Sequence, residues 1–203
     1  MLEIENKLYK EGYQYVACID EVGRGCLFGD VVACAIILPK GLRIEGVKDS
    51  KKLSAKKRED LYDIILEKSI AYGIGRVDNR KIDEINIKES TRLAMKYAVE
   101  NLKDKLGNNL IPDFLMIDAE SIDLDIEQES INKGDDLFHG IACASIIAKV
   151  YRDKLCQQWD KDHPGYGIGK HKGYGTKAHI EAIKELGPSE LHRNTFLRKI
   201  LKG

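Results

Sequence analysis

The stretch CIDEVGRGCLFGDVV, Cys18 to Val32, determines how the rest of the chain is interpreted. An apolar run typical of a buried strand ends in two adjacent carboxylates, Asp20 and Glu21, and a Gly-Arg-Gly turn follows at once. A second apolar run, DVVACAIILP, comes next, so the two runs predict a hairpin. Charge at the end of a buried strand needs either water or a charged partner.

The chain has 203 residues, enough for one well-buried core, and we expect a single domain over 1–203. It contains no run of about 18 apolar residues, and its charged start lacks the apolar stretch of a secretory signal. We therefore expect a cytoplasmic protein with no membrane association. The number of cysteines, five, is odd and no C-x-x-C spacing occurs, so we expect reduced core residues. These are Cys18, Cys26, Cys34, Cys143 and Cys156.

Charge is balanced overall, with 33 basic and 33 acidic residues, so no global basic field indicates a nucleic-acid partner. Basic residues nevertheless cluster over 48–58 and 170–179, and acidic residues cluster over 118–129. A local basic run can bind a polyanion, although most such runs, taken alone, are solvated surface.

The apolar periodicity alternates between strand and helix along the chain. Strands are expected over 13–20, 30–39, 70–77 and 113–118. Helices are expected over 54–69, 85–102 and 140–159, and from Thr176 to the Gly187-Pro188 stop. This order predicts an α/β domain with a mixed sheet and a helical C-terminal segment from about 160 to 203.

Four acids lie at the ends of predicted strands or just before a predicted helix: Asp20, Glu21, Asp118 and Asp135. Ligand sites of open α/β sheets gather at the carboxyl ends of strands, so these side chains are expected to converge. Converged carboxylates repel one another, and oxygen ligands favour a hard divalent ion, Mg²⁺ or Mn²⁺. For each acid alone, capping a turn or pairing with a lysine stays an open alternative.

Several motifs together carry a resemblance to a known family. They are IDEVGRGCLFGDVV, DSKKLS, IDEINI, MIDA, KGDD, ACASIIAKVYRD and HPGYGIGKHKGYGTKAH. In this order and spacing, from about Tyr15 to Phe196, the chain resembles type 2 ribonuclease H, the ribonuclease HII family. The resemblance implies a ribonuclease H-like mixed sheet flanked by helices. It also implies an endonuclease that cuts the RNA strand of RNA–DNA hybrids and cuts 5′ of single ribonucleotides in duplex DNA.

The resemblance assigns roles to particular residues. It implies two divalent ions, Mg²⁺ or Mn²⁺, held by Asp20, Glu21, Asp118 and Asp135, and products with 5′-phosphate and 3′-hydroxyl ends. It implies that Gly23, Arg24, Gly25 and Tyr174 sense the ribose 2′-hydroxyl at the junction of RNA and DNA. It makes the C-terminal segment a substrate-binding segment, and we expect a monomer whose partner is the nucleic acid.

Candidate phosphate contacts are Lys51, Lys52, Ser145 and Lys149. Arg24 can contact phosphate in a bidentate manner, and the alternative is a solvated side chain in a turn. For Ser145 the alternative is a small residue in a tightly packed helix.

The chain departs from the family pattern in two places. Cys26, Phe28 and Asp30 stand in the first loop, where the family usually has prolines and a small residue; we expect this to alter packing only. Asp136 follows Asp135 where the family usually has a small residue, so Asp136 is an alternative fourth carboxylate.

Two other functions remain open. One is a different metal nuclease or a transposase-like enzyme on the same scaffold, which would share the acids but lack the Gly-Arg-Gly and the late tyrosine. The other is a nucleic-acid-binding module without chemistry, which would not need four acids.

Overall fold

The computed structural model describes residues 3–48, 50–198 and 200–201. At its centre lies a six-stranded mixed sheet with the strand order β4-β3-β2-β1-β5-β6. The strands are β1 (Val16–Val22), β2 (Val31–Ile37), β3 (Ala71–Val77), β4 (Lys103–Asp104), β5 (Phe114–Asp118) and β6 (Gln128–Ile131). Strands β1 to β4 form an antiparallel meander, whereas β5 pairs parallel with β1 and β6 pairs parallel with β5. The predicted hairpin and mixed sheet are confirmed.

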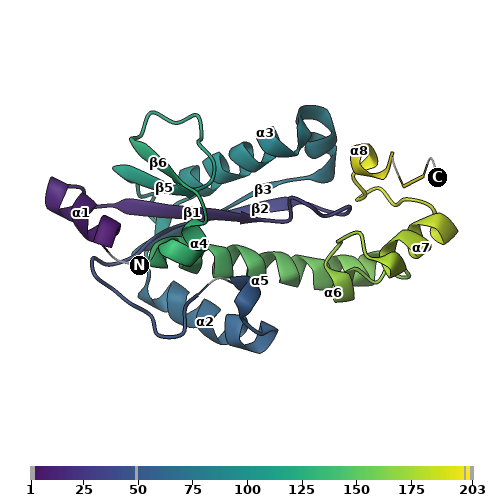
Figure 1. Cartoon of the computed structure of the whole chain (residues 1–203), viewed down its shortest axis with the longest axis horizontal. Coiled ribbons are helices and arrows are strands. Elements are labelled where there is room, and N and C mark those ends of the chain that lie inside the picture. Colours follow the sequence, from purple (N-terminus) through teal and green to yellow (C-terminus); the bar gives the residue numbers. More distant parts are fainter. Residues whose placement is uncertain (1–2, 49, 199, 202–203) are drawn as a thin grey trace.

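Helices cover both faces of this sheet. They are α1 (Glu3–Glu11), the 3-10 helix η1 (Ser50–Lys52), α2 (Ala55–Lys68), α3 (Asn79–Glu100), α4 (Gly134–Leu137), α5 (His139–Asp162), α6 (Ile168–His171), α7 (Lys177–Leu186) and α8 (Asn194–Leu197). Helix α3 packs on one face, and α2 and α5 pack on the other (Figure 1). No helix in the described part of the chain is both long enough and apolar enough to cross a membrane.

Strands β1 and β2 read as continuous apolar runs because both of their faces are buried. Cys18 and Cys34 belong to the core on the α2 and α5 side, whereas Ala17, Ile19 and Ala33 belong to the core on the α3 side. Successive residues alternate between the two cores because the side chains of a strand point to opposite faces with a period of two residues. All five cysteines are free and buried, as predicted.

The C-terminal segment packs at the far end of α5, next to the loop between β1 and β2 (Figure 1). Phe28 of this loop is fully buried against Cys156, Trp159 and Ile168. Its ring meets the ring of His192 edge-on, with centroids 4.8 Å apart. Phe28, which departs from the family pattern, therefore fills the interface between the first loop and the C-terminal segment.

Several elements were not predicted from the sequence. Helix α1 and the short elements β4, β6, α6 and α8 lack a long apolar period, and β6 begins inside the acidic run. The helix predicted over 85–102 begins earlier, at Asn79, and Asn86 interrupts it with φ 69° and ψ 167°. Asn86 Oδ1 accepts hydrogen bonds from the Lys88 and Glu89 amides, which is an N-cap in the middle of the element.

Candidate active site

Strand pairing brings the first three acids to one edge of the sheet. Asp20 and Glu21 lie near the end of β1, and Asp118 is the last residue of β5. The parallel register pairs Ile19 with Ile117, so Asp20 and Asp118 follow side by side at the carboxyl ends of neighbouring strands. The predicted convergence at this edge agrees with the register.

Asp135 reaches the same edge through the turn that precedes α5. The Gly134 amide donates a hydrogen bond of 2.7 Å to Asp118 Oδ1, which ties α4 to the end of β5. Asp135 is buried, with 7 % of its surface exposed, whereas Asp136 beside it is exposed. The two neighbouring acids therefore face different surroundings.

Burial and mutual repulsion make three of these acids, Asp20, Glu21 and Asp118, hard to ionise. Burial raises the pKa of Asp20 well above its ordinary value, and the carboxylates of Glu21 and Asp118 raise it further, against hydrogen bonding by Ser145 and the Glu21 amide. Burial also raises the pKa of Glu21, where Arg24 opposes the shift and Asp118 adds to it. For Asp118, burial raises the pKa, the Gly134 amide lowers it, and Asp135 raises it. Such a cluster is stabilised by added positive charge.

Two basic side chains supply part of that charge. Lys51 Nζ lies 3.6 Å from Asp135 Oδ2, and Arg24 Nη1 lies 3.5 Å from Glu21 Oε1. Within the described ranges, no three His, Cys, Asp or Glu side chains are already arranged as a metal-binding group. The oxygen-only donor set and the raised pKa values fit a hard divalent cation. In this structure, Lys51 and Arg24 neutralise part of the negative charge of these carboxylates.

Asp136 pairs with Lys52 instead of joining the other acids. This hydrogen bond lowers the pKa of Asp136, and further lysines nearby act in the same direction. Asp136 therefore behaves as a surface carboxylate in an ion pair, while Asp135 interacts electrostatically with Asp118.

The Gly-Arg-Gly turn and Tyr174 lie next to each other, although 149 positions separate Gly25 from Tyr174 in the sequence. The backbones of Cys26 and Tyr174 form an isolated antiparallel bridge, and the Leu27 amide donates to Gly173 O at 2.8 Å. A Cβ atom on Gly25 would lie 3.9 Å from Tyr174 Cε1. Tyr174 is 41 % exposed, so its ring is accessible beside the turn.

Gly23 requires glycine for two reasons. Its φ of +97° disfavours side chains, and a Cβ there would lie 2.4 Å from Arg152 Nε and 2.9 Å from Asp30 O. The turn is therefore tightly packed against Arg152 and Asp30 at Gly23, while Gly25 is exposed to solvent.

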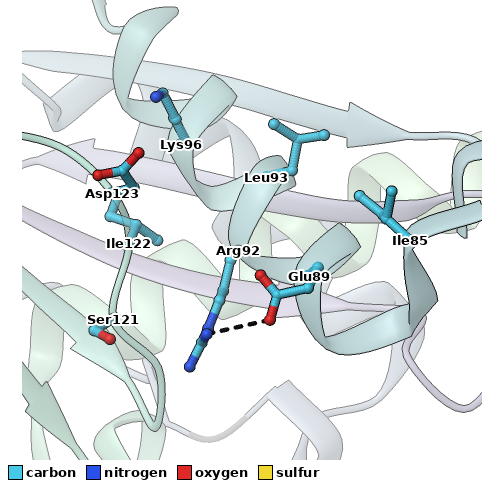
Figure 2. A pocket seen from close by; sticks show the side chains of 8 residues that line it. All are labelled: Ile85, Glu89, Arg92, Leu93, Lys96, Ser121, Ile122 and Asp123. Atoms are coloured by element: carbon cyan, nitrogen blue, oxygen red, sulfur yellow. Dashed lines mark hydrogen bonds and ion pairs between the residues drawn. The ribbon is translucent and has the colours of Figure 1, made fainter.

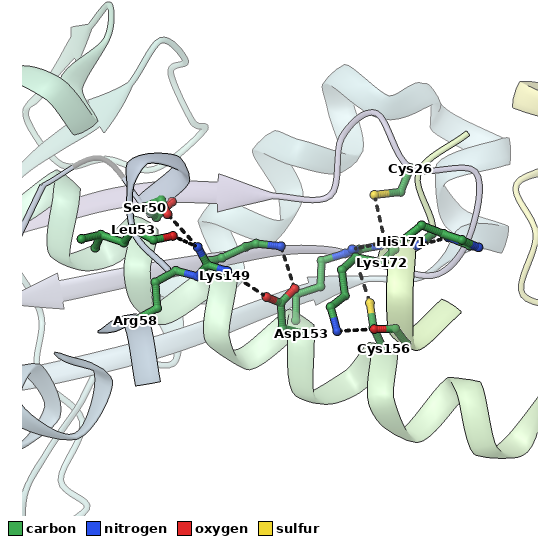
Figure 3. A network of polar contacts seen from close by, with 12 residues as sticks. Cys26, Ser50, Leu53, Arg58, Lys149, Asp153, Cys156, His171 and Lys172 are labelled. Atoms are coloured by element: carbon green, nitrogen blue, oxygen red, sulfur yellow. Dashed lines mark hydrogen bonds and ion pairs between the residues drawn. The ribbon is translucent and has the colours of Figure 1, made fainter. Parts of the chain in front are cut away.

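The lysines of the DSKKLS motif lie on η1, and Asp49 of that motif lies outside the described residues. Figure 3 shows how Arg58 supports this turn: Arg58 Nη1 donates to Ser50 O at 2.9 Å and to Leu53 O at 2.6 Å. Asp153 of α5 pairs with Arg58 at 3.7 Å, so η1 is fixed to α5.

The four candidate phosphate contacts do not share one environment. Lys51 and Lys52 project from η1 and pair with Asp135 and Asp136, and Lys149 donates to Asp153 at 2.7 Å. Ser145 is buried, and its Oγ lies 2.9 Å from Ser50 Oγ. Ser145 thus joins α5 to η1 and interacts with Asp20, in a packed position.

Sequence reasoning missed Glu120, a buried acid that pairs with Arg24 at 3.3 Å and with Arg92 at 3.1 Å. Figure 2 shows Arg92 on α3 with its neighbour Glu89, lining a pocket of about 490 Å³ beside residues 121–123. The acidic run 118–129 contains Glu120, but nothing in the sequence marks it among the other acids.

Comparisons with known proteins show the family of the chain. A family model described as Ribonuclease HII matches residues 17–199. Ribonuclease HII of Alkaliphilus oremlandii is 62 % identical over 200 residues, which cover 98 % of each chain. The structure of ribonuclease H2 from Pyrococcus horikoshii OT3 is 25 % identical with a TM-score of 0.74, and the match covers 93 % of this chain and 98 % of that one. A structure of Bst-RNase HIII in complex with Mn²⁺ is 19 % identical with a TM-score of 0.65, covering 96 % of this chain and 71 % of that one.

Proposed function

The chain belongs to the ribonuclease HII family of metal-dependent ribonuclease H endonucleases, which act on RNA–DNA hybrids, and from this premise we propose its substrates and mechanism. We propose that it cuts the RNA strand of hybrids and also cuts 5′ of single ribonucleotides in duplex DNA, leaving 5′-phosphate and 3′-hydroxyl ends. The observation that carries the proposal is the position of the Gly-Arg-Gly turn. It follows directly on the acids of β1 and pairs through Cys26 with the backbone of Tyr174.

Four acids are proposed to hold two divalent ions, Mg²⁺ or Mn²⁺: Asp20, Glu21, Asp118 and Asp135. When bound, such ions activate the attacking water and stabilise the charge on the leaving 3′-oxygen. Asp20 is the acid proposed to serve both ions, because it is the most buried of the four and interacts with both Glu21 and Asp118. The Bst-RNase HIII structure, similar in fold, was solved with Mn²⁺, which supports a divalent-ion site on this scaffold.

The protein's own residues then have distinct tasks. The Gly134 amide holds Asp118 in orientation, and burial keeps Asp20 away from water. Lys51 pairs with Asp135 and Arg24 pairs with Glu21, and each basic side chain would give up part of that contact to a bound cation. After release they are proposed to contact substrate phosphates, together with Lys52 and Lys149, while buried Ser145 is proposed to act near the scissile phosphate.

The 2′-hydroxyl distinguishes a ribonucleotide from DNA at an otherwise similar duplex. Gly25 lets the main chain approach a sugar edge, and the accessible ring of Tyr174 lies beside it. We propose that the amides of residues 23–25 read the 2′-hydroxyl and that Tyr174 stacks on the adjoining deoxyribose. The C-terminal segment from about residue 160 thereby completes the substrate site. We propose that a monomer suffices, because one chain supplies all of these groups.

A cleavage assay on three duplexes tests the proposal: an RNA–DNA hybrid, DNA with one ribonucleotide, and the same DNA without it. We expect Mg²⁺-dependent cutting of the first two and none of the third. A product with a 3′-phosphate would contradict the proposed chemistry. Cutting of the all-DNA duplex would favour a different nuclease on this scaffold, and binding without cutting would favour a module without chemistry.

A further inference from the structure

Arg193 lies behind the Gly-Arg-Gly turn, fully buried. Its Nη1 donates to Arg24 O and its Nε donates to Gly29 O, both at 2.9 Å. The guanidinium therefore holds two main-chain carbonyl oxygens of the first loop from the C-terminal segment, 169 positions away from Arg24 in the sequence. The planar fork of arginine suits two such acceptors at once.

The orientation of the Arg24 carbonyl sets the orientation of the next amide. The peptide bond between Arg24 and Gly25 is trans, so the carbonyl oxygen of Arg24 and the N–H of Gly25 point in opposite directions. Because the oxygen points to buried Arg193, the Gly25 N–H points away from the guanidinium. Gly25 is exposed, and none of the described residues accepts a hydrogen bond from its amide.

This arrangement is costly for the fold. Burial lowers the pKa of Arg193 to about 10, against nearby acids that raise it. Its Nη2 is buried and has no hydrogen-bond partner among the described residues. A buried donor without a partner destabilises a protein, so an apolar residue would anchor this segment at a lower cost. A cation on the Arg24 carbonyl also polarises the peptide group and strengthens its N–H as a donor.

We propose that Arg193 is a positioning residue for ribose recognition: it fixes the Arg24–Gly25 peptide so that the Gly25 N–H is directed at the 2′-oxygen of the ribonucleotide. The inference rests on the proposed function, in which the turn reads the 2′-hydroxyl. Arg193 itself touches no substrate. Its effect passes through the Arg24 carbonyl, while the same side chain also holds the loop at Gly29.

The test compares binding of two duplexes that differ in one 2′-hydroxyl. Dissociation constants are measured by fluorescence anisotropy, with Ca²⁺ replacing Mg²⁺ and with gels confirming that the duplex stays intact. The quantity of interest is the preference, the Kd for all-DNA duplex divided by the Kd for DNA with one ribonucleotide. Arg193→Met removes the donors at similar volume, and Arg193→Lys keeps a charge but lacks the fork that holds both carbonyls.

Asn79 provides a matched control. It is buried and anchors the same segment by donating to Glu190 O at 2.8 Å and His192 O at 3.1 Å, without touching the turn. Asn79→Ala should lower the melting temperature, as the Arg193 variants should, but should leave the preference unchanged. If Arg193 had a purely structural role, the Arg193 variants would behave like Asn79→Ala: the melting temperature would fall and the preference would stay unchanged.

We expect Arg193→Met to reduce the preference about tenfold, or to abolish it if the wild-type preference is smaller, because one hydrogen bond to the 2′-oxygen is misdirected. If Arg193→Met does not fold, Arg193→Lys decides, with an expected loss of about threefold or more. A wild-type preference in the Arg193 variants, or an equal loss in Asn79→Ala, would overturn the inference. Absence of any preference in the wild type would instead contradict the proposed function.

Discussion

Lys51 Nζ lies 3.6 Å from Asp135 Oδ2, so the acid of α4 is paired with a lysine from η1, a turn more than eighty residues earlier in the chain. Lys52 repeats this arrangement with Asp136. The two acids differ in burial, however, because Asp135 lies inward beside Asp118 and Asp136 lies outward. This difference predicts which of the two acids serves the reaction.

Asp135→Asn should reduce turnover on an RNA–DNA hybrid by several orders of magnitude, since it replaces a charged carboxylate of the proposed metal site with a neutral amide. Asp136→Asn should change turnover by less than about threefold, because it only breaks an exposed ion pair. Steady-state kinetics in Mg²⁺ measure both effects. The reverse order of effects would identify Asp136 as the ligand.

Replacement of both Lys51 and Lys52 by Ala should weaken binding to duplexes of every sequence. If both contact phosphate, the slope of log K against log salt should flatten by ~0.9 for each lost contact. The control replaces Lys103 and Lys105, on and beside strand β4 at the edge of the sheet, and should leave the slope unchanged. An unchanged slope in the Lys51 and Lys52 double variant would show that these two lysines are solvated surface residues and do not contact phosphate.

Tyr174→Ala should lower kcat/KM on DNA with one ribonucleotide by roughly 5- to 150-fold, which is the expected range for losing ~1 to 3 kcal/mol of stacking. Tyr174→Phe should lose less if stacking dominates, and as much if the hydroxyl carries the contact. Mg²⁺ binding, followed by calorimetry, should stay as in the wild type, since the tyrosine is not a ligand. Near-wild-type rates of both variants, on DNA with one ribonucleotide and on an RNA–DNA hybrid, would show that Tyr174 does not belong to the site.

Asp20→Asn should stabilise the metal-free protein at pH 8. Burial raises the folded-state pKa of Asp20, so ionisation of Asp20 destabilises the fold. This cost is absent below the unfolded pKa of about 3.9, grows as pH rises from there to the folded pKa, and is fully present above the folded pKa. Thermal unfolding in EDTA should therefore show a higher melting temperature for the variant at pH 8 and a smaller difference near pH 4.

Added Mg²⁺ should raise the melting temperature of the wild type more than that of Asp20→Asn, because the ion compensates the buried charge. A variant that is less stable than the wild type at pH 8 in EDTA would show that the Asp20 carboxylate is not the unfavourable charge inferred from its surroundings.

Local signals in the sequence predicted the main elements of the fold. The apolar runs before Asp20 and Asp118 were correctly predicted as strands because burial on both faces leaves a continuous apolar run. The helix starts predicted at Ser54 and Thr176 are confirmed, since each side chain caps its helix by accepting a hydrogen bond from an amide three residues later. The break at Asn86 was missed because a positive φ leaves no periodic trace.

The candidate site divides in the same way. Residue type and motif order predicted the four acids, the Gly-Arg-Gly turn and Tyr174 as site residues, because each belongs to a short segment whose chemistry is readable locally. The sequence alone did not identify Glu120, Arg58 or Arg193, since their partners lie on distant segments and their charges resemble those of any solvated residue. Only tertiary packing decides that the Arg193 guanidinium is buried beneath the turn and meets the Arg24 carbonyl. Hydrogen bonds and burial are relations between segments, whereas a single sequence records only neighbours along the chain.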